Sequence, residues 1–123
     1  NRHLNRKFKA AGLEITTEQW LVLVCLWNKD KLTQQAISEQ TFKDKASITR
    51  LLDTLSRHDL IERHSEPSDR RINLIHLTEK GKRLEEQAMA IVKESFEQAI
   101  TGITPQELLF SREIIIKLLN NII

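Results

Sequence analysis

The sequence of 123 residues predicts one mainly helical domain that carries a single small β-hairpin, an α+β fold. Two observations predict the helices. Most apolar residues recur at intervals of three and four, and the chain has only three glycines and two prolines. One observation predicts the hairpin: two short strand-like runs flank Pro67, Ser68 and Asp69, which are residue types that favour turns. A chain of this length can bury a core without disulfides.

The composition limits the partners that the chain can have. The net charge is only +2, so affinity for nucleic acid must come from cations gathered on one face. The single cysteine, Cys25, excludes an intramolecular disulfide and favours a reducing compartment. Because Cys25 lies in an apolar stretch, we interpret it as a packed core residue rather than a redox thiol. We expect no membrane span and no signal peptide, and because the chain begins at Asn1 rather than methionine, a missing native N-terminus stays open.

Two helices are predicted at the beginning of the chain. Apolar residues at helical spacing among basic residues predict a helix over residues 1–11, which Gly12 ends. Thr16, with Gln19 three residues later, forms a capping-box pattern at the start of a second helix over 17–28. This second helix is apolar on most sides, which is typical of a helix in the centre of a core.

A pair of shorter helices follows. We expect Thr33 to cap a helix over 34–40 and Asp44 to cap another over 45–58, with Phe42 as an apolar plug in the tight connection. Such a pair matches the helix-turn-helix, whose second helix enters the DNA major groove, although a solvated helix in an ordinary domain looks similar. The polar outer face of the second helix consists of Lys45, Ser47, Thr49, Arg50, Asp53, Thr54 and Arg57.

The hairpin is predicted from a first strand at 60–65 and a second at 72–77. Arg70 and Arg71 follow the turn directly, so its tip carries two guanidinium groups suited to phosphates or to a narrow minor groove. Asp69 can hold one of them in a charge-assisted pair. An ordinary surface hairpin with an ion pair is the alternative. The apolar residues of the second strand switch phase, which either a β-bulge or burial on both faces would explain.

Two further helices are predicted at the end of the chain. Thr78 caps a long helix over 79–100, and a close approach to a neighbouring backbone would explain Gly81 in its first turn. Thr104, followed by proline, starts the final helix, whose apolar residues, Ile123 among them, cover more than one face. We expect the same helix of a second subunit to cover these residues. Burial in the chain's own core with a frayed end is the alternative.

With these motifs in place, the chain resembles the MarR family of bacterial transcription regulators. The run Pro67-Ser68-Asp69-Arg70-Arg71, followed by Leu77-Thr78-Glu79-Lys80-Gly81, is similar to the family's wing signature. The stretch 44–55 resembles the family's recognition helix, and 60–63 resembles the strand after it. The order of a helix pair and then a hairpin with arginines is the layout of a winged helix.

Two positions depart from the family's pattern. Asp59 stands where the family usually has glycine, just before the strand. Thr41 and Phe42 stand in the turn of the helix pair, where a small residue or glycine is usual. Aspartate tolerates a left-handed backbone better than most residues do, so we expect the fold to be kept.

The resemblance implies a domain organisation. The chain, 1–123, would be a single MarR-like domain, with a winged helix-turn-helix lobe at 32–81. Residues 1–16 and 84–123 would form a helical dimerisation region. The protein would be an obligate homodimer that works in the cytoplasm, on the nucleoid.

The resemblance also implies a function. The dimer would be a sequence-specific regulator that binds a pseudo-palindromic duplex, as a repressor that a small aromatic or phenolic effector relieves. The helix 45–58 would lie in the major groove and the wing 65–71 at the minor groove. The effector pocket would be lined by Trp20, Leu23 and the first and long helices. The implied DNA-binding residues are Gln34, Gln35, Lys45, Ser47, Thr49, Arg50, Arg57, Asp69, Arg70 and Arg71.

Two other classes of function stay open. A winged helix used only for protein contacts would bind duplex DNA weakly and without sequence preference. The chain offers little for an enzyme, because its four histidines lack metal-ligand spacing and it has no glycine-rich phosphate loop. We therefore predict no catalytic residue, no metal site and no cofactor.

Overall fold

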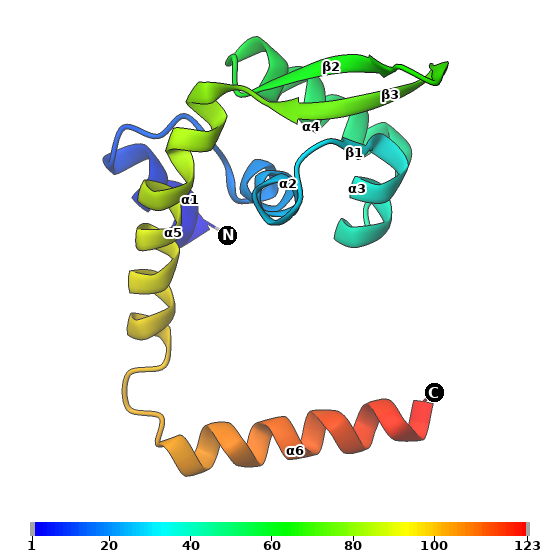
Figure 1. The fold of residues 1–123 in the computed structure, drawn as a ribbon. Helices are drawn as coiled ribbons and strands as arrows, with labels where there is room; N and C mark the ends of the chain where they lie inside the picture. The colour runs from blue at the N-terminus through cyan, green and yellow to red at the C-terminus, as the bar shows by residue number, and fades with distance from the viewer. Residues whose placement is uncertain (1, 123) are drawn as a thin grey trace. The chain divides into compact units, whose positions relative to one another are not determined.

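The computed structural model describes residues 2–122, in which the chain forms six helices and one three-stranded antiparallel sheet (Figure 1). This confirms the predicted fold class. The chain divides into two compact units, one up to Val92 and one from Lys93 onward. Two predicted helical residues, Asn1 and Ile123, lie outside the described residues. The elements are α1 (Arg2–Ala10), α2 (Thr17–Asn28), β1 (Leu32–Thr33), α3 (Gln34–Thr41), α4 (Lys45–Arg57), β2 (Ile61–Glu66), β3 (Asp69–Leu77), α5 (Glu79–Ala99) and α6 (Pro105–Ile122).

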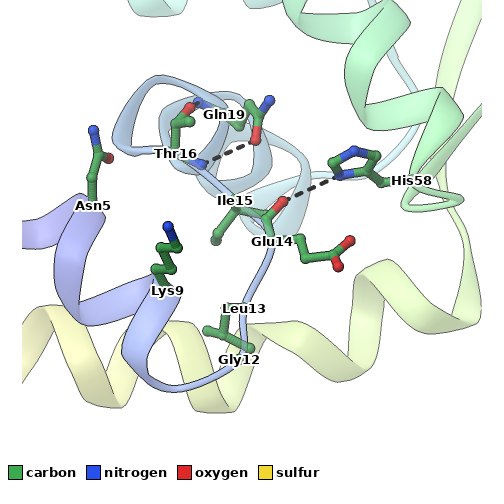
Figure 2. Close-up of a pocket in the computed structure, with 9 residues that line it drawn as sticks. All are labelled: Asn5, Lys9, Gly12, Leu13, Glu14, Ile15, Thr16, Gln19 and His58. Carbon is green, nitrogen blue, oxygen red and sulfur yellow. Dashed lines mark hydrogen bonds between the residues drawn. The ribbon is translucent and has the colours of Figure 1, made fainter.

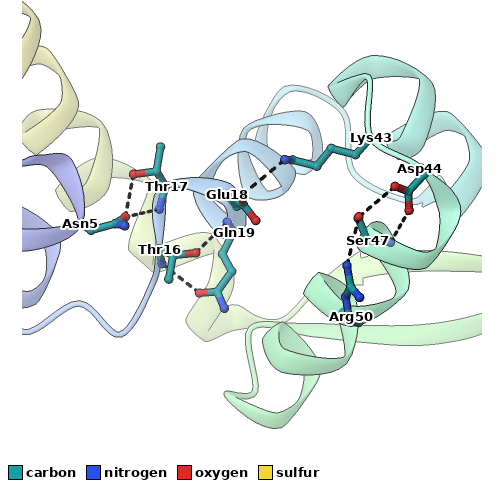
Figure 3. Close-up of polar contacts among 9 residues, drawn as sticks. All are labelled: Asn5, Thr16, Thr17, Glu18, Gln19, Lys43, Asp44, Ser47 and Arg50. Carbon is teal, nitrogen blue, oxygen red and sulfur yellow. Dashed lines mark hydrogen bonds and ion pairs between the residues drawn. The ribbon is translucent and has the colours of Figure 1, made fainter. Parts of the chain in front are cut away.

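The start of α2 is fixed by the predicted capping box. The Thr16 backbone N–H donates to Gln19 Oε1 at 3.0 Å, and the Gln19 N–H donates to Thr16 Oγ1 at 3.2 Å. The next residue ties α2 to α1, because the Thr17 N–H donates to Asn5 Oδ1 at 2.6 Å (Figure 3). Gly12, which follows the end of α1, has a left-handed backbone conformation with φ +80°.

Helix α2 lies in the middle of the first unit, with α1, α3, α4 and the sheet around it (Figure 1). Its side chains Val22, Leu23 and Leu26 are buried, as the predicted central helix requires. Cys25 is half-buried and packs against this core, where its Sγ–H donates to the Leu21 carbonyl. Burial raises the pKa of the Cys25 thiol, which disfavours the reactive thiolate.

The turn between α3 and α4 differs from the prediction. Phe42 is no plug, because its side chain is 96% exposed. The reason is its backbone: as the C-cap of α3, Phe42 adopts φ +56°, and the ring points into solvent. Asp59 also has a positive φ, of +59°. Both departures from the family's glycine pattern therefore occupy left-handed positions, which cost a residue with a Cβ roughly 1–2 kcal/mol.

The sheet has the strand order β1-β3-β2. Its hairpin turn consists of Pro67 and Ser68 alone, so the predictions that Asp69 lies in the turn and that the second strand starts only at residue 72 are wrong. Residues 69–71 belong to β3, because Asp69 already pairs with Glu66. The second strand therefore starts earlier than expected, and the wing arginines stand on a hydrogen-bonded strand.

The apolar residues of β3 switch from one face of the strand to the other, and the pairing with β2 shows how. A register shift lies near the turn, where Glu66 pairs with Asp69 but Ser65 pairs with Asn73. Beyond Asn73 the alternation is regular. Ile75 and Leu77 are buried against the core, whereas Leu74 on the other face is only half-buried and Ile72 is exposed. The register shift therefore precedes the phase switch: Leu74 and Ile75 lie on opposite faces of a regular strand, and only the face of Ile75 and Leu77 is buried.

The start of α5 is packed directly against the base of the hairpin. The Gly81 N–H donates to Thr78 Oγ1 at 3.0 Å, which confirms Thr78 as the cap. A Cβ at Gly81 would lie 2.2 Å from the Leu60 carbonyl oxygen, so the predicted close approach is confirmed. The Gly81 carbonyl also accepts from Trp27 Nε1 at 3.0 Å, which joins α5 to α2.

The second unit holds the end of α5 and the helix α6. Thr104 and Glu107 form the predicted capping box, with hydrogen bonds of 2.9 and 3.0 Å. All residues of α6 are described, and none of them is buried. Among the helices within residues 2–122, none is long and apolar enough to cross a membrane.

Candidate nucleic-acid interface

The first turns of α4 carry a chain of polar side chains. The Ser47 N–H donates to Asp44 Oδ1 at 2.7 Å, and the Ser47 hydroxyl lies 3.2 Å from Asp44 Oδ2. Arg50 Nη2 in turn donates to Ser47 Oγ at 3.3 Å (Figure 3). Hydrogen bonds from Ser47, together with the nearby Arg50, lower the pKa of the Asp44 carboxyl. The carboxylate thus both caps α4 and holds Ser47 and Arg50 on its exposed side.

The predicted residue at the start of α3 has a structural contact. Gln34 Nε2 donates to Thr49 Oγ1 at 2.6 Å and lies 3.5 Å from the Lys45 carbonyl. Thr49 Oγ1 also donates to that carbonyl, at 2.9 Å. Gln34 and Thr49 therefore hold α3 against α4, while the exposed Gln35 donates to Glu39 on its own helix.

The wing arginine is held by the predicted carboxylate. Arg71 Nε and Nη2 donate to the two oxygens of Asp69, each at 3.1 Å, in a bidentate pair. The Arg71 backbone N–H donates to the same carboxylate at 3.0 Å. The Arg71 guanidinium lowers the pKa of Asp69, and the carboxylate raises that of Arg71. The Arg71 side chain is nevertheless 91% exposed, so it is oriented and still accessible.

A groove of about 580 Å³ brings part of the predicted site together. Residues of α3, the start of α4 and the wing strand line it, including four of the predicted residues: Gln34, Gln35, Lys45 and Arg71. The remaining predicted residues of α4 lie along that helix outside the lining, with Arg57 at its C-terminal end. Arg70 lies on β3, exposed.

One contact of this face was not predicted. Arg63 Nη2 on β2 donates to Asp53 Oδ1 on α4 at 2.7 Å. The sequence holds a signal for it, because Arg63 stands two residues after the buried Ile61 and so shares its face of the strand. This pair ties the base of the wing to the middle of α4.

A second cavity, of about 770 Å³, lies beside the connection between α1 and α2 (Figure 2). Polar side chains from three elements reach it: Asn5 and Lys9 of α1, Gln19 of α2, and His58 at the end of α4. His58 Nδ1 lies 3.2 Å from the Glu14 carbonyl oxygen, within hydrogen-bonding distance. Of the residues predicted to line an effector pocket, those of α1 border this cavity, whereas Trp20, Leu23 and the long helix α5 do not.

Helix pair, three-stranded sheet and exposed wing arginines together define a winged helix-turn-helix protein. The MarR family model matches residues 15–72 of the chain. The organic hydroperoxide resistance transcriptional regulator of Bacillus subtilis (strain 168) is 34% identical over 93 residues, 74% of this chain and 63% of that protein.

Solved structures of regulators have the same fold. A probable transcriptional regulator from Pseudomonas aeruginosa has a TM-score of 0.81 and 28% identity, over 96% of this chain and 89% of that chain. A mutant MepR from S. aureus, bound to an oligodeoxyribonucleotide, has a TM-score of 0.67 and 25% identity, over 99% of this chain and 88% of that chain. The chain is therefore similar to MarR-family transcriptional regulators in both sequence and fold.

Proposed function

We propose that this chain is a homodimeric, sequence-specific DNA-binding repressor that a small aromatic or phenolic molecule releases from its operator. It acts by binding in the cytoplasm, on the nucleoid, without catalysis, metal or cofactor. Helix α4 enters the major groove, the wing reaches the minor groove, and two copies read a pseudo-palindromic site. The chain spans 63% of the Bacillus regulator's length. The DNA-bound structure of MepR supports the proposal that this fold binds DNA.

One observation carries the proposal: exposed cations on two different elements border one groove. Lys45 begins α4, and Arg71 stands on the wing strand across the groove of about 580 Å³. Asp69 holds Arg71 in a fixed direction, so little ordering is needed when it meets a phosphate or the narrow minor groove. Further along α4, Ser47 and Arg50 are available for base edges and phosphates.

Selection from a random pool of duplexes tests sequence specificity and identifies the operator in the same experiment. The proposal predicts one enriched pseudo-palindrome with half-sites about one DNA turn, roughly 10 base pairs, apart. Absence of any enriched motif would contradict the proposal and support a winged helix that contacts only proteins.

Arg71→Ala is expected to weaken binding to the selected duplex by about 10- to 100-fold, as loss of a base- or groove-reading arginine does. The fold should not change, because the Arg71 side chain is 91% exposed. The matched control is Arg83→Ala, which removes the same charge from an exposed position on α5. Fluorescence anisotropy measures both variants. Equal losses in the two would mean that only net charge matters and would contradict the assigned role of Arg71.

The dimer rests on the surface of α6. A helix of 18 residues without a buried side chain exposes apolar residues on more than one face. A second copy of the same helix would cover them, and a closed twofold pair leaves no further apolar surface for association. The exposed large apolar residues of α6 are Leu108, Leu109, Phe110, Ile114, Ile115, Ile116, Leu118, Leu119 and Ile122.

The cavity beside the α1–α2 connection is our candidate effector site. Leu13 and Ile15 give it apolar walls, and Lys9 supplies a cation for a carboxylate or phenolate (Figure 2). His58, the C-cap of α4, forms part of the wall and lies 3.2 Å from the Glu14 carbonyl oxygen. A ligand wedged between Glu14 and His58 would therefore shift the end of the helix that reads DNA.

Salicylate, a phenolic acid, is the probe for this site. We expect it to weaken binding of the wild-type protein to the selected duplex. Lys9→Gln should raise the half-maximal salicylate concentration by about fivefold, the size of one partly exposed ion pair. Arg2→Gln, on the same helix but outside the lining, is the control and should respond like wild type. An unchanged response in Lys9→Gln would place the effector elsewhere.

A further inference from the structure

The ring of Phe42 makes no visible contribution to the stability of the fold. It is 96% exposed, so it has almost no packing, and its backbone occupies the left-handed region at φ +56°. Strained, exposed positions of this kind are typical of contact sites, where the strain is kept for function. Glycine or asparagine would satisfy the same turn with less strain.

The backbone around Phe42 is held firmly. The Phe42 N–H, as the C-cap of α3, donates to the Ser38 carbonyl. The next residue is fixed twice, because the Lys43 N–H donates to Ser38 O at 3.2 Å and the Ser38 hydroxyl donates to Lys43 O. Lys43 Nζ also reaches Glu18 on α2, at 3.9 Å (Figure 3). The ring is therefore attached to a rigid segment of backbone, which lowers the entropy cost of a contact.

The position of Phe42 in the chain places it close to the expected DNA contact. Phe42 precedes Asp44, the N-cap of α4, by two residues, and the exposed Lys45 by three. A recognition helix enters the major groove with its N-terminal residues foremost, so the preceding turn lies at the rim of the groove. The apolar group that a duplex presents in the major groove is the thymine methyl, a known partner of phenylalanine.

We infer that Phe42 is a specificity-determining residue whose ring contacts the methyl group of one thymine in each half-site. This inference rests on the proposed DNA binding and adds a base reader outside α4 itself. The contact would be apolar and specific for the methyl group, unlike the charged contacts that the nearby lysines and arginines would make.

The test removes the ring and the methyl group separately. Thymines of the selected duplex are replaced one at a time by deoxyuridine, which lacks only the methyl. Binding is then measured for wild type, Phe42→Gly and Phe42→Tyr. The glycine variant relieves the backbone strain and should melt at the same or a higher temperature, whereas the tyrosine variant keeps both the ring and the strain.

We expect one thymine per half-site whose methyl loss weakens wild type and Phe42→Tyr by about fivefold, the size of one buried apolar contact. Phe42→Gly should be weakened by a similar factor on the thymine duplex and should not distinguish thymine from uracil there. A glycine variant that binds like wild type would overturn the inference. The inference would also be overturned if Phe42→Gly weakened binding but every single thymine-to-uracil replacement affected wild type and the variant equally. Failure of wild type to prefer the selected duplex would instead contradict the proposed function itself.

Discussion

Ile115→Glu/Leu118→Glu is expected to convert a dimer of about twice 14.3 kDa into a monomer. Both side chains are more than half exposed in the single chain, so their replacement removes little packing within the protomer. In a twofold dimer each change counts twice, because the same helix is contributed by both subunits. Loss of about four buried apolar contacts, each worth roughly 1.5–3 kcal/mol, weakens association at least a thousandfold.

Sedimentation equilibrium of the variant and of wild type measures this effect. Arg112→Glu/Lys117→Glu is the matched control, since it also adds two carboxylates to exposed positions of α6 without removing an apolar side chain. The control should remain dimeric. A wild-type protein that sediments as a monomer would contradict the dimer. An apolar-to-glutamate variant that stays dimeric would show that the interface lies on other residues.

Gly81→Ala is expected to destabilise the fold by about 3 kcal/mol and to lower the melting temperature by roughly 10–20 °C. Alanine is the better helix former by about 1 kcal/mol, so propensity alone would predict the opposite sign. Sterics decide, because the new Cβ would lie 2.2 Å from the Leu60 carbonyl oxygen, a backbone atom that cannot rotate away. Moving α5 outward would also break the hydrogen bond from Trp27 Nε1 to the Gly81 carbonyl.

Thermal and urea unfolding followed by circular dichroism measure the loss. Gly12→Ala is the control, since no atom lies within 4 Å of its added Cβ. Its φ of +80° still disfavours alanine, so we expect a loss of about 1 kcal/mol there. An alanine at Gly81 that stabilises the protein would refute the close approach of α5 to the hairpin base.

Local signals in the sequence predicted most of the fold. The capping residues Thr16, Thr33, Asp44, Thr78 and Thr104 all stand at the starts of helices, because a cap acts on backbone groups only three residues away. The three–four spacing of apolar residues likewise placed the buried faces. Caps and spacing depend on neighbours along the chain, which is why they can be read without tertiary information.

The features that escaped prediction depend on distant atoms or on uncommon backbone conformations. Phe42 was expected to be buried because it is apolar, but the left-handed C-cap of α3 turns its ring outward. The pair between Arg63 and Asp53 joins residues of two elements, and only the face shared by Arg63 and Ile61 hints at it. The early start of β3 at Asp69 follows from its pairing with Glu66 of β2 on the turn side of the register shift, which the alternation within one strand does not reveal.

The DNA-binding residues were predicted from a family resemblance, and the structure adds geometry to that assignment. It brings Gln34, Gln35, Lys45 and Arg71 to one groove and fixes Arg71 by a bidentate pair with Asp69. It also gives Gln34 and Thr49 a contact between α3 and α4. The roles of these residues in binding stay predictions, which the arginine variants and the duplex titration address.

Sequence-specific binding of duplex DNA can be measured by a titration across salt concentrations. Wild-type protein is titrated into the selected duplex and into a scrambled duplex of the same length and composition. We predict one dimer per selected duplex and a preference of about a thousandfold or more at physiological salt. The logarithm of the binding constant should fall linearly with the logarithm of the salt concentration, as phosphate contacts require. Equal and weak binding to both duplexes would contradict sequence-specific DNA binding by this protein.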